Sequence, residues 1–418
     1  MKKTIIPIRF ILVFSTFLLT VLLYVDRACI SAAKSDISSE LGFSMTDFGW
    51  IMAVFTLGYA LFQAPSGKLA DRKGARGVIA GIVMVWSILT AITGFAWSYS
   101  SMLIIRFLFG AGEAGAFPAL SKVVYNWYPV NERGIVQGIN FSGSRIGAAF
   151  AIPLVAWLIK EIGWRHAFLV FGCFGIVYGI LWYLLFRDKP ENSKFIGNDE
   201  LEFIKKYRQQ PETGIVKSLS FSTILKSSTI WKTNIQYICS NFTFYFSLTW
   251  MYPYIQERFH LGSVEAGFYA SIPLVAGAVG NWVAGVMIDS IYKNGNWKLS
   301  RRLPAIIGFS LSAIGMIAVT QVSSPVLSVV FMALAVFGAD MTLSPSWAFC
   351  IDIGKENAGA VSGTMNMAGN LGAFVTIIAF PYLFQWTGQY EPFFFICSGL
   401  SGVAILIWFN MNPEKSIN

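Results

Sequence analysis

Two loops of similar composition organise this chain. The first reads Gly67-Lys-Leu-Ala-Asp71-Arg72-Lys73-Gly74-Ala-Arg76-Gly77, and the second begins Gly285-Val-Met-Ile-Asp289 and continues through Lys293, Lys298, Arg301 and Arg302. Each loop follows the second long apolar stretch of its half of the chain. The repeat therefore predicts two halves built on one plan.

The composition excludes a soluble enzyme. The 418 residues are 55% hydrophobic and only 13% charged, whereas soluble domains are roughly 25% charged. The 36 Phe and 14 Trp residues suit lipid-facing and interfacial surfaces, and the 38 Gly residues suit close helix packing. These values predict a multi-pass membrane protein whose main partner is the lipid bilayer.

Hydropathy predicts twelve membrane-spanning helices, because about 20 apolar residues cross a bilayer. The predicted spans are residues 9–32, 45–66, 76–97, 101–124, 133–160, 165–187, 231–258, 264–290, 302–322, 325–349, 356–386 and 390–411. The predicted fold is an all-α membrane protein with two pseudo-symmetric bundles of six helices. Residues 1–187 form the first bundle, 188–230 a cytoplasmic linker with a short amphipathic helix from Asn198 to Gln210, and 231–418 the second bundle.

The net charge of +9 could indicate a nucleic-acid partner, so the location of the basic residues has to decide. With the amino terminus in the cytoplasm, 24 of the 31 Lys and Arg residues lie on the cytoplasmic side. The exceptions are Lys34, Lys160, Arg165 and Arg258 outside, and Arg27, Arg106 and Arg145 within spans. This is the positive-inside bias. It predicts an inner-membrane protein with both termini cytoplasmic and no nucleic-acid role.

The fourth span carries two charges at membrane depth, in Arg106-Phe-Leu-Phe-Gly-Ala-Gly-Glu113-Ala-Gly-Ala-Phe-Pro118. A charge there costs about 2.5–3.5 kcal/mol on insertion scales, so it indicates function. Arg106 and Glu113 are two helical turns apart and share a face. Arg106 is a candidate anion ligand, with helix–helix packing as the alternative. Glu113 is the better coupling candidate, because a buried carboxyl can alternate between its protonated and charged forms.

Two further spans of the first half carry ionisable residues. Tyr24 and Arg27 share a face of the first span, while Asp26 points to another neighbour. The alternative is that Asp26 and Arg27 mark only the end of that helix. Arg145 lies mid-span after Ser142-Gly-Ser144 and could bind an anion bidentately. Its alternative is a buried ion pair with Glu113 or Asp340.

The second half offers neutral polar candidates. Ser346 and Trp347 follow Asp340 on the tenth span, and Asn366 and Asn370 share one face of the eleventh. These side chains could bind the hydroxyl groups of a substrate. Hydrogen bonding between helices is the alternative interpretation.

The repeated loop has a physical rationale as a conformational latch. Gly67 permits close helix approach, and Asp71 can cap a helix or pair with a basic group. The conformational motif comprises Gly67, Asp71, Arg72, Gly74 and Arg76, with Asp289 in the second copy. The alternative is that the basic residues only set the membrane orientation.

No cofactor or metal motif occurs in the chain. There is no P-loop, no G-x-G-x-x-G after a strand and no histidine cluster, since only His166 and His260 exist. We therefore expect no cofactor, no metal site and no enzymatic activity.

Several motifs together resemble one family. They are Tyr24-x-Asp26-Arg27, the Gly67 to Gly77 loop with its G-x-x-x-D-R-x-G-x-R/K pattern, Arg106-Phe-Leu-x-Gly-x-x-Glu113-Ala-x-x-Phe-Pro118, Gly163-Trp-Arg165 and Asn366-x-x-x-Asn370. On these motifs the chain resembles the anion:cation symporters of the major facilitator superfamily. That group includes bacterial hexuronate, galactonate and glucarate transporters and the animal sialic-acid and vesicular-glutamate carriers.

The resemblance implies the roles of individual residues. Asp26 and Glu113 would be the protonatable pair, and Arg27 would meet a substrate carboxylate. The surrounding residues would be Tyr24, Tyr59, Ser346, Trp347 and Asn366 or Asn370. The sugar-acid carriers have a glutamine near the place where this chain has Ser144-Arg145. That departure would favour a dianion or an aromatic carboxylate.

The sequence thus predicts a proton-coupled importer of a small organic anion that works by alternating access and is monomeric. Two alternatives stay open. One is an exporter or an anion or organophosphate antiporter on the same fold, and the other is a ligand sensor that does not transport.

Overall fold

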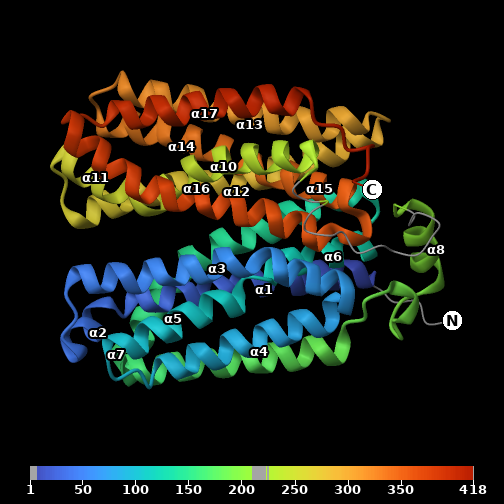
Figure 1. The fold of residues 1–418 in the computed structure, drawn as a ribbon, viewed down its shortest axis with the longest axis horizontal. Helices are drawn as coiled ribbons and strands as arrows, with labels where there is room; N and C mark the ends of the chain where they lie inside the picture. The colour runs from blue at the N-terminus through green and yellow to red at the C-terminus, as the bar shows by residue number, and fades with distance from the viewer. Residues whose placement is uncertain (1–6, 210–222, 224–225, 418) are drawn as a thin grey trace. The chain divides into compact units, whose positions relative to one another are not determined.

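The computed structural model describes residues 7–209, 223 and 226–417, and helices are the only regular secondary structure in these ranges (Figure 1). The first-half helices are α1 Ile8–Ala32, α2 Lys34–Leu41, α3 Met45–Lys73, α4 Ala75–Thr93, α5 Tyr99–Glu113, α6 Ala116–Trp127 and α7 Arg133–Leu185. Then come α8 Asn198–Tyr207, α10 Ser228–Thr249, α11 Met251–Phe259, α12 Ser263–Lys293, α13 Trp297–Thr320, α14 Pro325–Met341, α15 Leu343–Gly354, α16 Ala358–Thr387 and α17 Glu391–Phe409. The predicted all-α class is confirmed.

Nine stretches within the described residues are long and apolar enough to cross a membrane, and together they include ten of the predicted spans. One of the nine, Pro325–Thr387, contains two of them. The predicted span 133–160 lies within α7. The predicted span 231–258 is helical but more polar, because it carries side chains such as Asn234, Gln236 and Asn241.

Three predicted spans are each divided into two helices. The breaks follow Glu113, Thr249 and Met341, and a proline lies close behind each of them, at Pro118, Pro253 and Pro345. Proline lacks the N–H that would bond the carbonyl four residues earlier, and its ring crowds that carbonyl. Hydropathy alone does not predict such a break. One consequence is that Glu113 becomes the last residue of α5.

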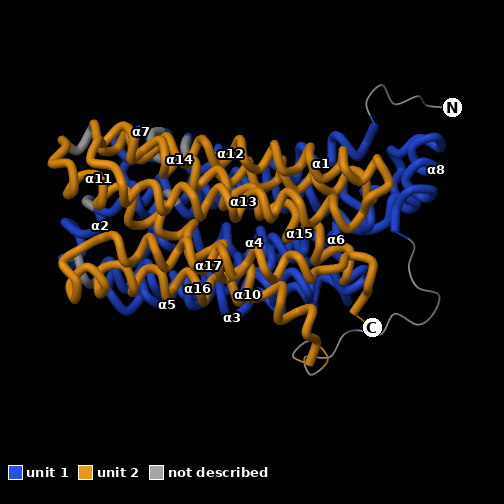
Figure 2. Tube along the Cα trace, turned by 90° about the horizontal axis from the view of Figure 1, so that it is seen from above, with its two compact units in different colours: residues 1–129, 146–219, 354–367 blue, residues 130–145, 220–353, 368–418 orange. Residues whose placement is uncertain are grey.

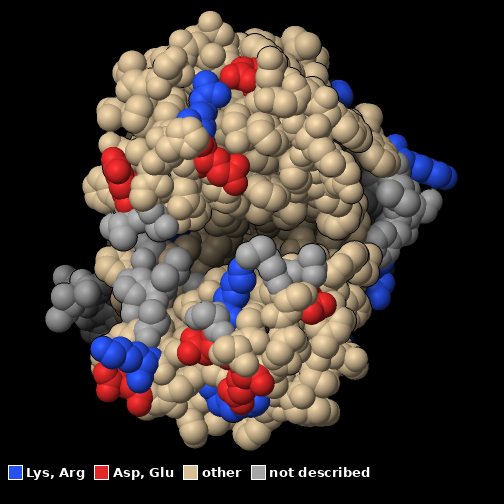
Figure 3. Space-filling view, turned by 90° about the vertical axis from the view of Figure 1, so that its left-hand side faces the viewer, with Lys and Arg blue, Asp and Glu red and all other residues tan. Residues whose placement is uncertain are grey.

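Helix α7 includes two predicted spans and bends at Gly163, where φ is 79°. The bend is fixed by Glu40, which accepts hydrogen bonds from Trp164 Nε1 at 2.6 Å and Arg165 Nε at 2.9 Å. Figure 3 views the molecule from the side on which α2 lies in Figure 1, and its charged side chains form small mixed groups on a largely uncharged surface. The hydrogen bonds of Glu40 to Trp164 and Arg165 explain the Gly163-Trp-Arg165 motif.

The chain forms two compact units (Figure 2). Unit 1 contains residues 1–129, 146–219 and 354–367, and unit 2 contains residues 130–145, 220–353 and 368–418. Each unit has its own buried apolar cluster, with Phe168 in the first and Phe246 in the second. The predicted division at residues 187 and 231 stays a prediction. In the units, the first residues of α7 belong with the second half, and the first residues of α16 with the first half.

Helix α8 confirms the short helix predicted after Asn198, although Gln210 lies outside the described residues. Glu200 of α8 accepts hydrogen bonds from the backbone N–H groups of Ile8 at 2.8 Å and Arg9 at 3.0 Å. A carboxylate at a helix N-terminus accepts hydrogen bonds from otherwise unpaired N–H groups and interacts favourably with the positive end of the helix dipole. The linker helix therefore caps the start of α1.

Candidate functional site

The centre of unit 1 is a buried ion pair between α1 and α5. Arg27 Nε donates to Glu113 Oε1 at 2.7 Å, and the side chains of Arg27 and Glu113 are 16% and 1% exposed. The small residues Gly110, Gly112 and Gly115 flank Glu113 and allow helices to pack around it. Two residues that the sequence suggested as functional are thus in direct contact.

Aromatic rings surround the Arg27 guanidinium. Its central carbon lies 5.0 Å from the ring centroid of Tyr24, 5.2 Å from that of Phe55 and 4.4 Å from that of Tyr59. Cation–π attraction stabilises a guanidinium without neutralising it. Arg27 therefore has a fixed position and keeps its positive charge, which Glu113 balances in this structure. The predicted Tyr24 and Tyr59 both lie at this site.

Asp26 is the second carboxyl of this cluster and is 1% exposed. Trp86 of α4 lies next to it, and Glu113 and Arg106 interact with it electrostatically. Neither carboxylate oxygen accepts a hydrogen bond of normal geometry from the described part of the chain. An ionised carboxylate in that condition is costly, so this group is suited to bind a proton.

Arg106 completes the cluster. It is 2% exposed, and its guanidinium lies over the rings of Phe55 and Phe109 at 4.8 and 4.7 Å. Its electrostatic partners are Glu113, Arg27 and Asp26. With all four groups ionised, the two positive and two negative charges cancel. Binding an anion would leave the cluster negative unless a proton also binds.

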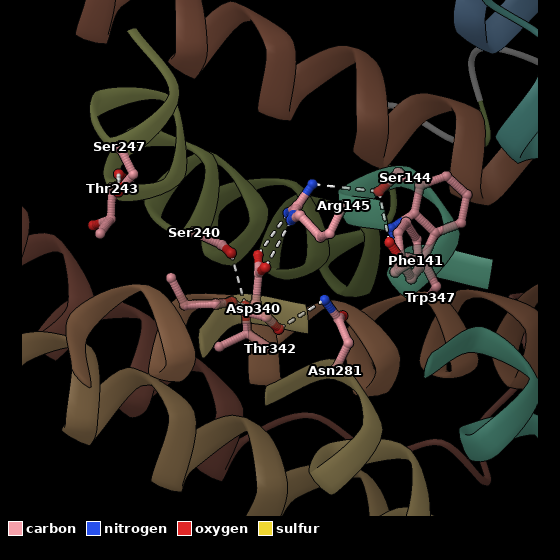
Figure 4. Close-up of polar contacts among 12 residues, drawn as sticks. Phe141, Ser144, Arg145, Ser240, Thr243, Ser247, Asn281, Asp340, Thr342 and Trp347 are labelled. Carbon is pink, nitrogen blue, oxygen red and sulfur yellow. Dashed lines mark hydrogen bonds and ion pairs between the residues drawn. The ribbon is translucent and has the colours of Figure 1, made fainter. Parts of the chain in front are cut away.

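Unit 2 contains a second arginine–carboxylate pair (Figure 4). Arg145 donates from Nε to Asp340 Oδ2 at 2.8 Å and from Nη2 to Asp340 Oδ1 at 2.7 Å. The Arg145 guanidinium also lies 4.0 Å from the ring centroid of Phe244. A Cβ atom at Gly277 would come within 2.3 Å of Asp340 Oδ2, so only glycine leaves room for this carboxylate. Of the partners that the sequence left open for Arg145, the structure shows Asp340.

Ser346 and Trp347 are both buried in unit 2 and satisfied within it. Ser346 Oγ donates to the Thr342 carbonyl at 2.6 Å, and Trp347 Nε1 donates to the Tyr237 hydroxyl at 2.9 Å. Trp347 also packs against Phe141 at 5.4 Å between ring centroids. These contacts tie α15 to its neighbours, and a substrate role for the two residues stays a prediction.

The two asparagines of α16 fall in different units. Asn366 belongs to unit 1 and is 6% exposed, whereas Asn370 belongs to unit 2 and accepts a hydrogen bond from the Tyr245 hydroxyl at 3.0 Å. The division between the two units thus falls within α16, between Asn366 and Asn370. Their role in binding substrate stays a prediction.

The predicted loops are wrong in part, because Gly67 and Asp71 lie within α3, and Gly285 and Asp289 within α12. The two aspartates of these repeated segments cap helix starts in the same way in both units. Asp71 accepts from the backbone N–H groups of Gly359 at 3.0 Å and Ala360 at 2.7 Å, at the start of α16. Asp289 accepts from those of Gly134 at 2.9 Å and Ile135 at 2.8 Å, at the start of α7. Each carboxylate thus interacts favourably with the positive end of a helix dipole.

Glycines make these contacts possible. A Cβ atom at Gly67 would come within 2.0 Å of the Gly359 carbonyl oxygen, and one at Gly285 within 2.8 Å of the Gly134 carbonyl oxygen. The helices therefore meet backbone to backbone. In both copies the glycine comes four residues before the aspartate. The glycine allows the close helix approach that brings the backbone N–H groups within reach of the aspartate.

The remaining motif residues turn the chain into α4. Gly74 has φ 87°, and a Cβ atom there would meet the Asp188 carboxylate. Asp188 accepts a hydrogen bond from the Arg76 backbone at 2.9 Å, while Arg76 Nε donates to the Tyr183 carbonyl at 2.7 Å. Arg72 of the same motif lies in the last turn of α3.

Sequence reasoning missed several contributors to both clusters. Phe55 lies one turn before Tyr59 on the same face, a spacing that could have identified it. Trp86 lies mid-span, whereas tryptophan is usually enriched at the membrane interface. Phe244 and Gly277 carry no signal of their own, because their roles depend on packing around Arg145 and Asp340.

No metal centre accompanies these clusters within the described ranges. No group of three or more His, Cys, Asp or Glu side chains there is placed to bind a metal ion. The described side chains of the two clusters are guanidinium groups, carboxyl groups and aromatic rings.

Comparison with known proteins identifies the family of the chain. Residues 16–377 match the family model of the Major Facilitator Superfamily, and the chain belongs to that superfamily. Within it, the curated relatives place the chain among the anion transporters. These are transport proteins and not enzymes.

Two relatives and one solved structure illustrate the similarity. The chain is 30% identical to the probable sulfoacetate transporter of Cupriavidus necator, over 94% of this chain and 92% of that protein. It is 31% identical to the probable galactarate/D-glucarate transporter of Escherichia coli K12, over 92% and 88%. The fold is similar to that of the proton:xylose symporter XylE, with a TM-score of 0.74, 16% identity and 95% coverage of both chains.

Proposed function

We propose that this protein imports a small organic anion together with protons across the inner membrane by alternating access. The observation that carries the proposal is the charge-balanced cluster of unit 1, in which Glu113 pairs with Arg27 and Asp26 accepts no hydrogen bond of normal geometry from the described residues. An anion and Glu113 compete for the same guanidinium. Protonation of Glu113 removes the competitor, so anion binding and proton binding favour each other.

Both carboxyls contribute to this coupling. Two nearby carboxylates in a low-dielectric setting repel each other, and a proton on either one relieves the repulsion. In the proposed cycle, protons from the outer side reach Asp26 and Glu113, and the substrate carboxylate then binds Arg27. Release of the substrate and protons inside restores the Arg27–Glu113 pair.

The loop aspartates are the proposed latches of the cycle. Asp71 and Asp289 each bind two backbone N–H groups at a helix start. Such contacts can break and reform without covalent change, as alternating access requires. The positive-inside bias supports cytoplasmic termini, which would place both loops on the cytoplasmic side.

The substrate class follows from the guanidinium and from the relatives. Arg27 suits a carboxylate or sulfonate group, and the relatives are named for galactarate, D-glucarate and sulfoacetate. We therefore propose a sugar-acid-like or similarly small organic anion.

Transport in proteoliposomes tests this function. The purified protein should accumulate one of these anions when the outside is acidic, and protons should enter with it. The pH gradient should drive accumulation even without a membrane potential. If the anion accumulates inside only when the interior is acidic, and protons leave as the anion enters, the protein is an antiporter.

A further inference from the structure

A groove of about 1170 Å³ lies in unit 1 at the end where α1 begins. Its walls come from the first turns of α1, the last turns of α7 and the segment from Ser193 to Phe203, which includes α8. Figures 1 and 2 both show α8 at this end of unit 1. The groove is separate from the Arg27–Glu113 cluster, none of whose members lines it.

One part of the groove is apolar and faces outward. The side chains of Ile11, Phe14 and Leu18 on α1 and of Leu181 and Leu185 on α7 are 40–59% exposed and line it. These helices span the membrane, so such surfaces face hydrocarbon. From Ile8 to Leu18 the helix rises about 15 Å, which is the depth of one leaflet. An acyl chain matches this wall in length and chemistry.

The other part of the groove is polar and carries a positive balance. Arg9 is paired with Glu200 at 3.5 Å. Arg187 and Lys194 form no ion pair with any residue in the described ranges, and Asp199 is the one remaining acid of the lining. The charged lining residues therefore leave a net charge of +1. One phosphodiester group would neutralise it.

The groove also contains a buried donor. Trp182 lines the groove and is 4% exposed, yet its indole N–H donates to no acceptor in the described part of the chain. Trp182 is held by stacking on Phe186 at 4.4 Å, and Trp127 Nε1 donates to the Arg187 carbonyl at 2.9 Å. An unpaired N–H in an apolar setting is costly, so an acceptor on a ligand would stabilise it.

We propose that the groove binds one anionic phospholipid of the adjacent leaflet. Its phosphate lies at Arg187 and Lys194, an ester carbonyl accepts from Trp182, and an acyl chain covers the wall formed by α1 and α7. With the start of α1 cytoplasmic, as proposed above, this is the inner leaflet. The lipid would fasten α8 against the start of α1.

Native mass spectrometry of the full-length protein in detergent tests this site. The probes are phosphatidylglycerol and phosphatidylcholine with identical acyl chains, and inorganic phosphate alone. The wild-type protein should retain one phosphatidylglycerol in preference to phosphatidylcholine, and phosphate alone should not compete. Arg187→Gln with Lys194→Gln should weaken phosphatidylglycerol binding about tenfold. Binding of phosphatidylcholine should weaken much less, because its choline group already offsets the phosphate charge.

Lys189→Gln is the matched control, because Lys189 is exposed and does not line the groove. It should bind as the wild type does. Leu181→Trp, which fills the apolar wall, should lose both lipids, and Trp182→Phe should weaken both equally. Lys194 is exposed, so Lys194→Gln alone tests the charge even where Arg187 is needed for folding.

Equal retention of the two lipids by the wild type would overturn the proposal, as would unchanged preference in the Arg187 and Lys194 variant. Competition by inorganic phosphate alone would show a phosphate site and not a lipid site. None of these outcomes depends on transport.

Discussion

Each unit contains a buried arginine–carboxylate pair beside a helix break, Arg27–Glu113 in unit 1 and Arg145–Asp340 in unit 2, and the two pairs are built differently. Unit 2 also buries Asp352 between Arg133 and Arg301. In the two pairs beside a break, the carboxyl lies where a proline interrupts a span, Glu113 at the end of α5 and Asp340 at the end of α14. Arg27 donates one hydrogen bond to Glu113, whereas Arg145 donates two to Asp340. A bidentate pair is the stronger and more directional contact.

The surroundings increase this difference. Next to the Arg27 pair lie Asp26, whose oxygens accept no hydrogen bond within the described ranges, and Arg106. Next to Asp340 the hydroxyls of Ser240 and Thr342 bond each other at 2.7 Å. The comparison teaches that a satisfied ion pair suits a structural tie, and an incompletely satisfied one suits exchange of partners.

The largest expected effect is on anion binding at unit 1. Arg27→Gln should lower uptake and counterflow of the anion at least about a hundredfold, because it removes charge-assisted hydrogen bonds worth about 1.5–3 kcal/mol each. The thermal stability should change little, since Glu113 can then bind a proton. Retained counterflow in this variant would show that the anion binds elsewhere.

The second effect is on stability at unit 2. Arg145→Gln leaves Asp340 buried without its partner and should destabilise the protein by about 3–5 kcal/mol. Thermal unfolding in detergent measures this loss. Arg145→Met combined with Asp340→Leu should restore most of it, because apolar residues can replace a buried pair. A fully stable Arg145→Gln protein would contradict a structural role for this pair.

The loop aspartates sharpen the comparison, because their contacts are alike in the two units. Asp71→Asn and Asp289→Asn should each lower the free energy of unfolding by about 1–2 kcal/mol, through loss of a charged helix cap. The two losses should be similar and additive in the double variant. Glu202→Gln, at an exposed position, is the control. Unequal losses would show that the two loops are not equivalent.

The smallest effect concerns Glu40, which is exposed. Hydrogen bonds from Trp164 and then from Arg165 lower the pKa of Glu40 below its usual value. A lowered pKa stabilises the fold above the unfolded-state pKa and loses that contribution as the pH falls through the folded-state pKa. Glu40→Gln should therefore lower the melting temperature by no more than about 2 °C at neutral pH. Below the lowered pKa the two proteins should melt together, and a pH-independent difference would contradict this account.

Much of the architecture could be predicted from sequence. Long apolar runs identify spans because the bilayer thickness fixes their length. The breaks after Glu113 and Met341 could not be predicted from hydropathy, although Pro118 and Pro345 give a physical reason for them. The Asn198 helix was visible because its periodicity is local.

The contacts of the site were only partly predictable. Charge at membrane depth identified Arg27, Glu113 and Arg145, but the choice of Asp340 as the partner of Arg145 depends on packing between distant helices. The sequence predicted Asp71 and Asp289 as the residues of the repeated motif that make contacts, but it did not predict the groups that donate hydrogen bonds to them. Those donors are backbone N–H groups, for example those of Gly359 and Ile135, and every residue except proline possesses such a group.

Glu113 is the centre of this account, and Glu113→Gln tests it most directly. In proteoliposomes, this variant should exchange labelled anion for unlabelled anion at close to the wild-type rate, because a neutral side chain leaves Arg27 available. It should fail to accumulate the anion under an inward proton gradient. Full gradient-driven accumulation by the variant would contradict the assignment of Glu113 as the coupling residue.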